Sequence, residues 1–305
     1  MEKETFLVIV GPTGVGKTRA ALELAERSDA EILSADSRQI YRYMDIGTAK
    51  PSPEERKKVQ HYFIDIVDPD QTYTAGDYGQ QARQQLQDLF RRDKTAIVVG
   101  GSGLYIRALL DGLSPELPSD PEIKNQLVAE IKILGSTELH RRLREVDPQA
   151  AERIHPHDSQ RILRALEVFQ ISGKKISELQ KILPRDKLEF TPLVVGLNME
   201  RRKLYQRIEQ RVEKMIEEGL VEEARKLLQM GYDKDLNSLK TVGYKEIFPL
   251  LDGKRTLKDT VAEINKNSRR YAKRQLTWFC NDPKVRWIED FGGYSTALRK
   301  LFCDS

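Results

Sequence analysis

The sequence has few of the residues that build disulfide scaffolds or cysteine-bound metal sites. Only two cysteines occur among 305 residues, Cys280 and Cys303, and they lack the spacing of a zinc site. Two isolated cysteines are typical of reduced thiols inside a cell. We therefore expect a cytoplasmic protein whose fold depends on its hydrophobic core alone.

Long apolar runs are also missing. No stretch approaches the ~20 apolar residues that a membrane-spanning helix needs. Residues 1–4 lead directly into an apolar strand, which leaves no room for a signal peptide. The net charge is only +4, although charged residues make up 32% of the chain. We expect no membrane association, and any binding to nucleic acid would depend on a local basic patch.

One stretch organises the rest of the chain, and it reads Gly11-Pro12-Thr13-Gly14-Val15-Gly16-Lys17-Thr18. It follows an apolar run and precedes a helical pattern over 17–28, which is the context of a phosphate-binding loop. Its glycines let backbone N–H groups turn toward anionic oxygens, and the following helix adds the positive end of its dipole. We expect Lys17 to neutralise phosphate charge and Thr18 to bind a magnesium ion. The alternative is a chance glycine-rich turn.

A candidate catalytic carboxylate follows the next strand. Residues 30–34 read as a short strand that ends just before Asp36. Ligands of parallel α/β sheets sit at the carboxyl ends of the strands, so Asp36 is expected beside the phosphate pocket. An Asp in this position could instead cap a helix. The segment 39–51 mixes aromatic, basic and turn residues without periodicity, which predicts an active-site loop.

Apolar strands recur at 62–66, 95–99 and 192–197, with helical patterns between them. This alternation predicts an α/β fold in which helices flank a parallel sheet. Glycines at 100–103 end one strand, where either close approach of a ligand or a tight turn would require them. One long helix is expected from 204 to about 231.

The middle of the chain reads differently. Residues 113–121 have the composition of a linker, and 122–181 are helical throughout. Helices without interleaved strands indicate an all-helical domain inserted into the α/β core. Arg161 and Arg164 face one side of a helix, where they would either close on phosphates or form solvated salt bridges. The predicted boundaries are 1–112 and 192–305 for the core and 113–191 for the insertion.

The most basic run lies at 265–279. On a helix five cations share one side, and two aromatic residues stand one heptad apart: Lys266, Arg269, Arg270, Lys273 and Arg274, with Tyr271 and Trp278. A basic face with interleaved aromatics suits a phosphodiester backbone. A solvated face with its aromatics in the core explains the pattern equally well.

Together these segments resemble the tRNA dimethylallyltransferase family over nearly the whole chain. The matching stretches are Gly11–Thr18, Ser34–Tyr41, Met44–Pro51, Gly100–Tyr105, Ser159–Arg161, Arg164–Val168, Val242–Tyr244 and Ala272–Trp278. The phosphate loop occurs in many nucleotide-binding families. The D-S-x-x-I-Y and M-D-I-G-T-A-K-P blocks are far more specific, and they occur in the family's order.

The resemblance implies an activity. The loop would hold the diphosphate of dimethylallyl diphosphate together with Mg²⁺ on Thr18. Asp36 matches the family's catalytic aspartate and would take a proton from N6 of an adenosine beside the anticodon. Ser102 stands where the family more often has threonine and would support catalysis with Thr18.

The resemblance also implies how tRNA is bound. The residues expected to contact it are Asp36, Ser37, Arg38, Gln39, Ser102, Lys124, Gln160, Arg161, Arg164 and Lys240. The helical insertion would grip the anticodon stem–loop, and the adenosine would flip out of its stack to reach the site. We expect a monomer.

Two other functions share part of this pattern. A small-molecule or nucleoside-monophosphate kinase would have the same loop, an aspartate at the second strand end and an arginine-bearing lid. It leaves the loop 39–51 and the basic C-terminal region unexplained. An RNA-binding protein without enzymatic activity would use the basic helix, but it leaves Lys17, Thr18 and Asp36 unexplained.

Overall fold

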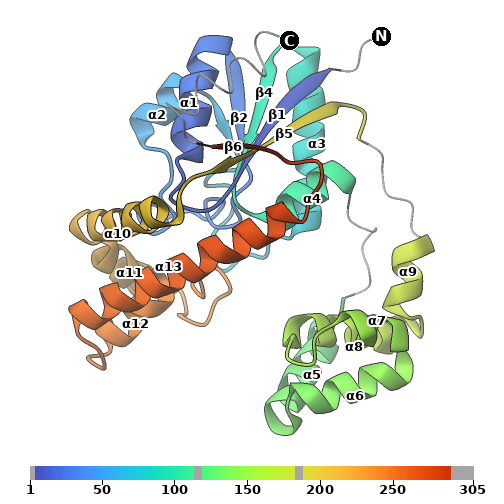
Figure 1. Ribbon diagram of the computed structural model, residues 1–305. Coiled ribbons are helices and arrows are strands. Elements are labelled where there is room, and N and C mark those ends of the chain that lie inside the picture. The colour runs from blue at the N-terminus through green and yellow to red at the C-terminus, as the bar shows by residue number, and fades with distance from the viewer. Residues whose placement is uncertain (1–3, 113–118, 183–187, 290–305) are drawn as a thin grey trace. The chain divides into compact units, whose positions relative to one another are not determined.

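The computed structural model describes residues 4–112, 119–182 and 188–289. These residues belong to two compact units (Figure 1). The first comprises Met1–Leu110 with Leu188–Ser305, and the second comprises Asp111–Lys187. The sequence analysis expected the insertion at 113–191, so its boundaries differ from those of the second unit by two residues at the start and four at the end. The expected linker 113–121 lies mostly outside the described residues.

A parallel sheet forms the centre of the first unit. Its strands are β1 (Thr5–Val10), β2 (Ala30–Ser34), β3 (His61–Tyr62), β4 (Thr95–Val99), β5 (Thr191–Asn198) and β6 (Arg286–Glu289). They lie in the order β3-β2-β4-β1-β5-β6, and every described pair is parallel. In register, Leu7 of β1 stands opposite Ile97 of β4 and Leu193 of β5. The predicted α/β fold is confirmed.

Helices cover both faces of this sheet. The described helices of this unit are α1 (Lys17–Ser28), α2 (Pro53–Lys58), α3 (Ala75–Arg91), α4 (Gly103–Asp111), α10 (Arg201–Glu217), α11 (Leu220–Gln229), α12 (Tyr244–Leu251) and α13 (Leu257–Cys280), of which α11 and α12 pack against α10 and α13 and not against the described strands of the sheet. Helix α1 covers one face and α3 the other (Figure 1). The core beneath α1 joins buried side chains of β1, such as Leu7 and Ile9, to Leu204 of α10 and Ala272 of α13. Burial on both faces explains why the central strands are continuous apolar runs.

The second unit is all helical. It contains α5 (Pro121–Leu134), α6 (Ser136–Val146), α7 (Pro148–Arg153), α8 (Ser159–Ser172) and α9 (Ile176–Ile182). Its own core includes Leu127, Leu143 and Ile162, all essentially inaccessible to solvent. Buried Asp147 caps α7 through the N–H of Ala150 at 3.0 Å and accepts the hydroxyl of Ser177 at 2.7 Å. This carboxylate therefore ties α7 to α9.

Two predicted elements were wrong in extent. The strand expected at 62–66 covers only His61–Tyr62, because Phe63 and Asp65 adopt positive φ angles of 63° and 56°. The helix expected from 204 to 231 is two helices, α10 and α11. They separate at Gly219, whose φ of 102° is left-handed and cannot continue a right-handed helix.

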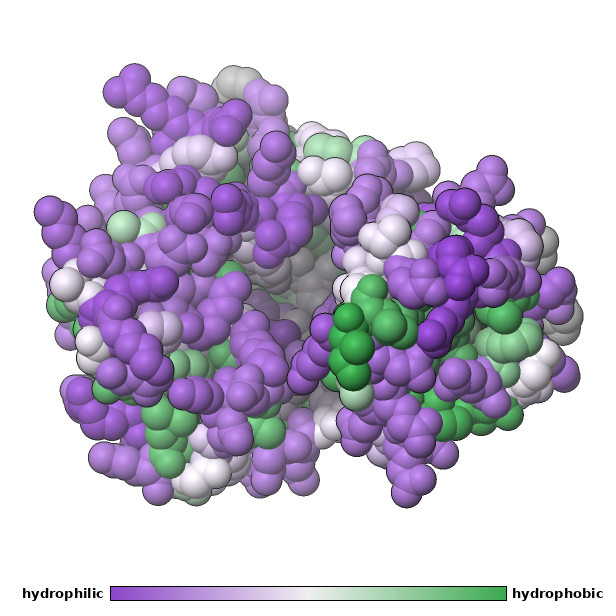
Figure 2. Space-filling model, turned by 90° about the horizontal axis from the view of Figure 1, so that it is seen from below, coloured by the Kyte–Doolittle hydropathy of each residue, from purple (hydrophilic) through white to green (hydrophobic). Residues whose placement is uncertain are grey.

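The surface agrees with the charged composition. Hydrophilic residues cover most of the face seen in Figure 2. None of the helices within the described residues combines the length and apolar character needed to cross a membrane.

Candidate active site

A cavity of about 70 Å³ opens at the carboxyl ends of the central strands in the first unit. The phosphate loop, the turn after β2 and the glycines after β4 contribute to its wall, as do parts of the loop 39–51. Helices α10 and α13 close it with Arg211, Tyr271 and Gln275. The cavity therefore joins segments that are far apart in the sequence.

The phosphate loop connects β1 directly to α1. Gly16 precedes the first helical residue with a φ of 102°, and no side chain caps the helix there. The first N–H groups of α1 are thus available to an anion, with the helix dipole behind them. Thr13, Lys17 and Thr18 all line the cavity.

Two cations meet in this cavity. Lys17 Nζ donates to the carbonyl oxygens of Gly11 and Pro12, both at 2.9 Å, so the side chain folds back over its own loop. Burial lowers the pKa of Lys17 to about 7; the charge of Asp36 opposes this shift and that of Arg211 adds to it. Burial also lowers the pKa of Arg211. Arg211 has no hydrogen-bond or ion-pair partner among the residues that the structure describes.

Asp36 lies on the wall of the same cavity. Its Oδ1 accepts the backbone N–H of Arg38 at 2.9 Å, which fixes the carboxylate in a turn just after β2. Burial has the larger effect on three groups near Asp36: it lowers the pKa of Lys17 and Arg211 and raises the pKa of Tyr271. The negative charge of Asp36 raises the pKa of all three. The carboxylate therefore lies near both cations and the phenol of Tyr271, which line the same cavity.

Gln275 of α13 joins the two glycine-rich turns. Its Oε1 accepts the N–H of Thr13 at 2.8 Å, and its Nε2 donates to the carbonyl of Gly101 at 3.0 Å. Gln275 is buried, so both bonds are shielded from water. One amide thus fixes the spacing between the phosphate loop and the turn after β4.

Comparison with known proteins identifies the family. The IPP transferase family model matches residues 39–282. The chain is 48% identical to tRNA dimethylallyltransferase 2 of Geotalea uraniireducens (strain Rf4) over 300 residues, covering 98% of this chain and 97% of the relative. It is 47% identical to the tRNA dimethylallyltransferase of Thermotoga maritima, covering 98% of both chains.

This chain belongs to the IPP transferase family.

Solved structures agree with this assignment. The full-length tRNA isopentenylpyrophosphate transferase of Bacillus halodurans is 38% identical with a TM-score of 0.72, covering 99% of this chain and 96% of that one. A eukaryotic dimethylallyltransferase acting on tRNA is 26% identical with a TM-score of 0.79, covering 99% and 80%. The resemblance found in the sequence motifs is therefore confirmed.

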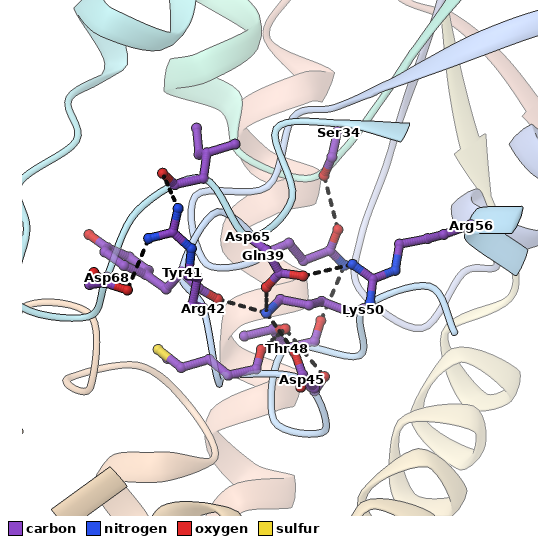
Figure 3. A network of polar contacts seen from close by, with 12 residues as sticks. Ser34, Gln39, Tyr41, Arg42, Asp45, Thr48, Lys50, Arg56, Asp65 and Asp68 are labelled. Atoms are coloured by element: carbon purple, nitrogen blue, oxygen red, sulfur yellow. Dashed lines mark hydrogen bonds and ion pairs between the residues drawn. The ribbon is translucent and has the colours of Figure 1, made fainter. Parts of the chain in front are cut away.

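The loop 39–51 of this IPP transferase is held by buried polar contacts (Figure 3). Gln39 accepts the hydroxyl of Ser34 at 2.9 Å and donates to the carbonyls of Thr48 and Ala49 at 3.3 and 3.1 Å. Both the oxygen and the nitrogen of the Gln39 amide thus have hydrogen-bond partners in the protein, although Gln39 lines the cavity.

Lys50 anchors the far end of the loop. Its side chain is only 2% exposed, and Nζ contacts Asp45 at 2.7 Å and Asp65 at 2.5 Å. Nζ also donates to the carbonyl of Tyr41 at 2.7 Å, and Arg56 completes the network on Asp65 at 2.7 Å. A buried cation with three oxygen partners holds an irregular segment in one conformation.

The other expected tRNA contacts of the first unit do not line the cavity. Arg38 donates to the carbonyl of Asn237 at 2.8 Å, which links the turn after β2 to the segment before α12. Ser37 is partly exposed in the same turn. Lys240 forms an exposed ion pair with Asp235 at 3.0 Å. Ser102 follows the cavity residue Gly101, but it does not itself line the cavity.

The expected contacts of the second unit gather on α5 and α8. Lys124, Gln160 and Arg161 are exposed, and Arg161 lies 3.4 Å from Asp158. Arg164 contacts the buried carboxylate of Glu167 at 2.7 Å. Burial would raise the pKa of Glu167, but hydrogen bonds from Ser119 and Arg164 outweigh it and lower the pKa. Arg164 therefore has a structural partner, whereas Arg161 presents its charge to solvent.

The basic run forms the second half of α13. Lys266 pairs with Glu263 at 3.1 Å and Arg269 with Glu209 at 2.7 Å. Arg270, Lys273 and Arg274 are exposed and form no ion pair with any residue that the structure describes. The face is thus solvent-accessible, and ion pairs with the described residues leave part of its charge unneutralised.

Sequence reasoning missed three cavity residues. Arg211 lies in a helical pattern whose charged positions cannot be told apart. Gln275 belongs to the matching stretch Ala272–Trp278, but no catalytic or binding role was predicted for it or for His61. Arg211 could have been found only from its place beside apolar positions 208 and 212, which sets it near the buried side of α10.

Proposed function

We propose that this chain transfers a dimethylallyl group from dimethylallyl diphosphate to the exocyclic N6 of an adenosine beside the anticodon of tRNA, releasing diphosphate. The observation that carries the proposal is that Asp36 shares one cavity with Lys17 and Arg211. An anion site and a carboxylate base are the two parts that this reaction needs.

The cations act on the leaving group. As the allylic C–O bond breaks, its electron pair stays with the diphosphate, so negative charge grows there. Lys17, Arg211 and the N–H groups at the start of α1 are in position to hold this charge. Arg211 suits the task because it has no protein partner among the described residues and presents a planar, permanently charged group.

Asp36 acts on the nucleophile. The N6 lone pair of adenine is delocalised into the ring, so the amine becomes reactive only as it loses a proton. The new N–C bond forms from the nitrogen electrons, and the proton passes to the Asp36 carboxylate. The hydrogen bond from the N–H of Arg38 leaves the other carboxylate oxygen available for this transfer.

Mg²⁺ fits the residues at the loop. Thr18 lines the cavity, and its hydroxyl has no hydrogen-bond partner among the described residues. Magnesium is usually held by few protein oxygens together with phosphates and water, and a single hydroxyl beside a diphosphate site matches that pattern. The ion would supply further positive charge to the leaving group.

Binding of tRNA would use both units. In the first unit the candidates are Asp36, Ser37, Arg38, Gln39, Ser102 and Lys240, with the exposed cations of α13. In the second they are Lys124, Gln160, Arg161 and Arg164. Exposed Arg161 supports a phosphate contact more directly than Arg164, whose partner is Glu167. Monomeric state and cytoplasmic location stay predictions.

The test uses unmodified tRNA with either labelled dimethylallyl diphosphate or labelled ATP. The expected result is label on adenosine from the prenyl donor and none from ATP, with release of diphosphate. Phosphorylation by ATP without prenylation would replace this function with that of a kinase. Binding of tRNA without either transfer would indicate an RNA-binding protein.

A further inference from the structure

His61 brings an unpartnered nitrogen to the cavity. It is the first residue of β3 and lines the cavity wall. Its Nδ1 lies 2.7 Å from the carbonyl oxygen of Val59, and because a carbonyl only accepts, Nδ1 carries the proton. Nε2 is therefore a hydrogen-bond acceptor. This nitrogen is buried and has no partner among the described residues.

The sheet register places His61 at the end of the cavity away from the phosphate loop. The loop follows β1, and β4 and β2 lie between β1 and β3. His61 stands opposite Ile32 of β2, three strands from β1, which is about 14 Å at the usual strand spacing. The cavity wall includes apolar side chains, such as those of Ile32 and Pro51, and polar ones, such as those of Ser34 and Thr48. The cavity thus has a cationic end at the phosphate loop and, away from it, one buried nitrogen lone pair that has no partner among the described residues.

A buried acceptor without a partner is costly, so it is expected to interact with a ligand. A neutral dimethylallyl tail has no hydrogen-bond donor. The tail becomes electron-poor when the C–O bond breaks, because the departing diphosphate takes the electron pair. A fixed lone pair beside the tail would then be stabilising in the transition state and not in the ground state.

The Nε2 lone pair of His61 is available only while the imidazole is neutral. Burial lowers the pKa of His61, and the charge of Arg56 adds to this effect. The bond to Val59 and the charge of Glu55 act in the opposite direction but do not outweigh it. His61 is therefore neutral near pH 7 and keeps its lone pair.

We propose that Nε2 of His61 faces the dimethylallyl group of the bound donor and stabilises the positive charge that develops on it. His61 forms and breaks no bond. The C–O electrons leave with diphosphate, the N6 electrons form the new C–N bond, and the N6 proton goes to Asp36. The inference rests on the proposed function, which supplies the donor.

The test compares side chains with and without an acceptor at this position. His61→Phe and His61→Leu lack the lone pair, whereas His61→Gln places an amide oxygen near the position of Nε2. We expect Phe and Leu to lower the single-turnover rate of prenyl transfer tenfold or more, with the KM for the donor within threefold of wild type. His61→Gln should recover a large part of the rate.

A matched control lies next in the chain. Tyr62→Phe removes a polar contact from the same strand, the bond from the Tyr62 hydroxyl to Glu31, outside the cavity. Its rate should stay within twofold of wild type. Inhibition by inorganic diphosphate should be equal in all variants, because that anion uses only the cationic end.

The outcomes separate this inference from the function on which it rests. Failure of the wild-type protein to prenylate tRNA would overturn both. A wild-type protein that prenylates, with unchanged single-turnover rates in Phe and Leu, would overturn the role of His61 alone. A raised donor KM at an unchanged rate would also overturn it, since that result indicates ground-state contact only.

Discussion

Glu223 of α11 and Tyr244 of α12 share a 2.6 Å hydrogen bond behind the loop 39–51. Burial and the charge of Glu223 raise the pKa of Tyr244 well above its usual value, so the phenol is the donor. The same carboxylate accepts three consecutive backbone N–H groups, those of Asp45, Ile46 and Gly47, at 2.8–3.0 Å. The Tyr244 ring fills the space where a Cβ on residue 47 would lie, at 2.4 Å. Two helices outside the cavity thus fix a segment that lines it.

Glu223→Gln should therefore destabilise the protein. The amide keeps one acceptor oxygen but turns an NH₂ group toward N–H donors, so we expect a loss of about 1–3 kcal/mol in the free energy of unfolding. Denaturant titration measures this loss. Glu222→Gln is the control, because the side chain of Glu222 pairs, among the described residues, only with exposed Arg225, and its substitution should change stability by less than about 0.5 kcal/mol. Equal effects of the two substitutions would contradict the anchoring role.

Asp36→Asn tests the base. The amide cannot take the N6 proton, so we expect the rate of transfer to fall by about 10²–10⁴-fold. Binding of diphosphate should persist or tighten, because a negative charge beside Lys17 and Arg211 is removed. Asp70→Asn, at an exposed carboxylate outside the cavity, is the control. A near-normal rate in Asp36→Asn would assign the proton transfer to another group.

The low pKa of Lys17 predicts that kcat/KM for the donor depends on pH. Its pKa of about 7 means that the side chain of the donor-free protein is cationic below pH 7 and neutral above it. Since the cation binds the diphosphate, kcat/KM for the donor should fall as pH rises through about 7. Lys17→Arg stays charged over this range, so its profile should lack that fall even if its activity is lower. A wild-type profile that is flat from pH 6.5 to 8.5 would contradict the low pKa.

The sequence was enough to predict that residues 11–18 form a loop between a strand and a helix, with Thr13, Lys17 and Thr18 on the cavity wall. Residues 11–18 form a local structure whose glycine spacing and flanking strand and helix are all encoded within about 25 residues. The position of Asp36 also follows from one strand and the rule that ligands gather at carboxyl ends. These predictions depend on local pattern, which sequence reasoning handles well.

Features that depend on distant contacts were not predicted. Strand β6 joins the sheet edge beside β5 through a four-residue run that is not apolar throughout. The wall of the cavity includes Arg211 and Gln275, which come far later in the sequence than the phosphate loop and the turn after β4; Gln275 is 174 residues beyond its partner Gly101. In the sequence, an Arg or Gln at these helical positions looks like an ordinary surface residue. Only the packing of α10 and α13 against the phosphate loop shows that both side chains line the cavity.

The exposed half of α13 allows the two explanations of its charge to be separated. Arg270 and Lys273 are exposed and form no ion pair with a described residue, so they can neutralise phosphates without breaking an existing bond. We expect the double substitution Arg270→Gln and Lys273→Gln to weaken tRNA binding. It should also reduce the slope of log Kd against log salt concentration by about 1 for each phosphate that is no longer neutralised. Lys57→Gln, which removes an exposed lysine on α2, is the control for net charge. Filter binding from 50 to 300 mM salt gives the slopes. If the double substitution and the control have the same slope as wild type, the basic face of α13 is a solvated surface and tRNA is held elsewhere.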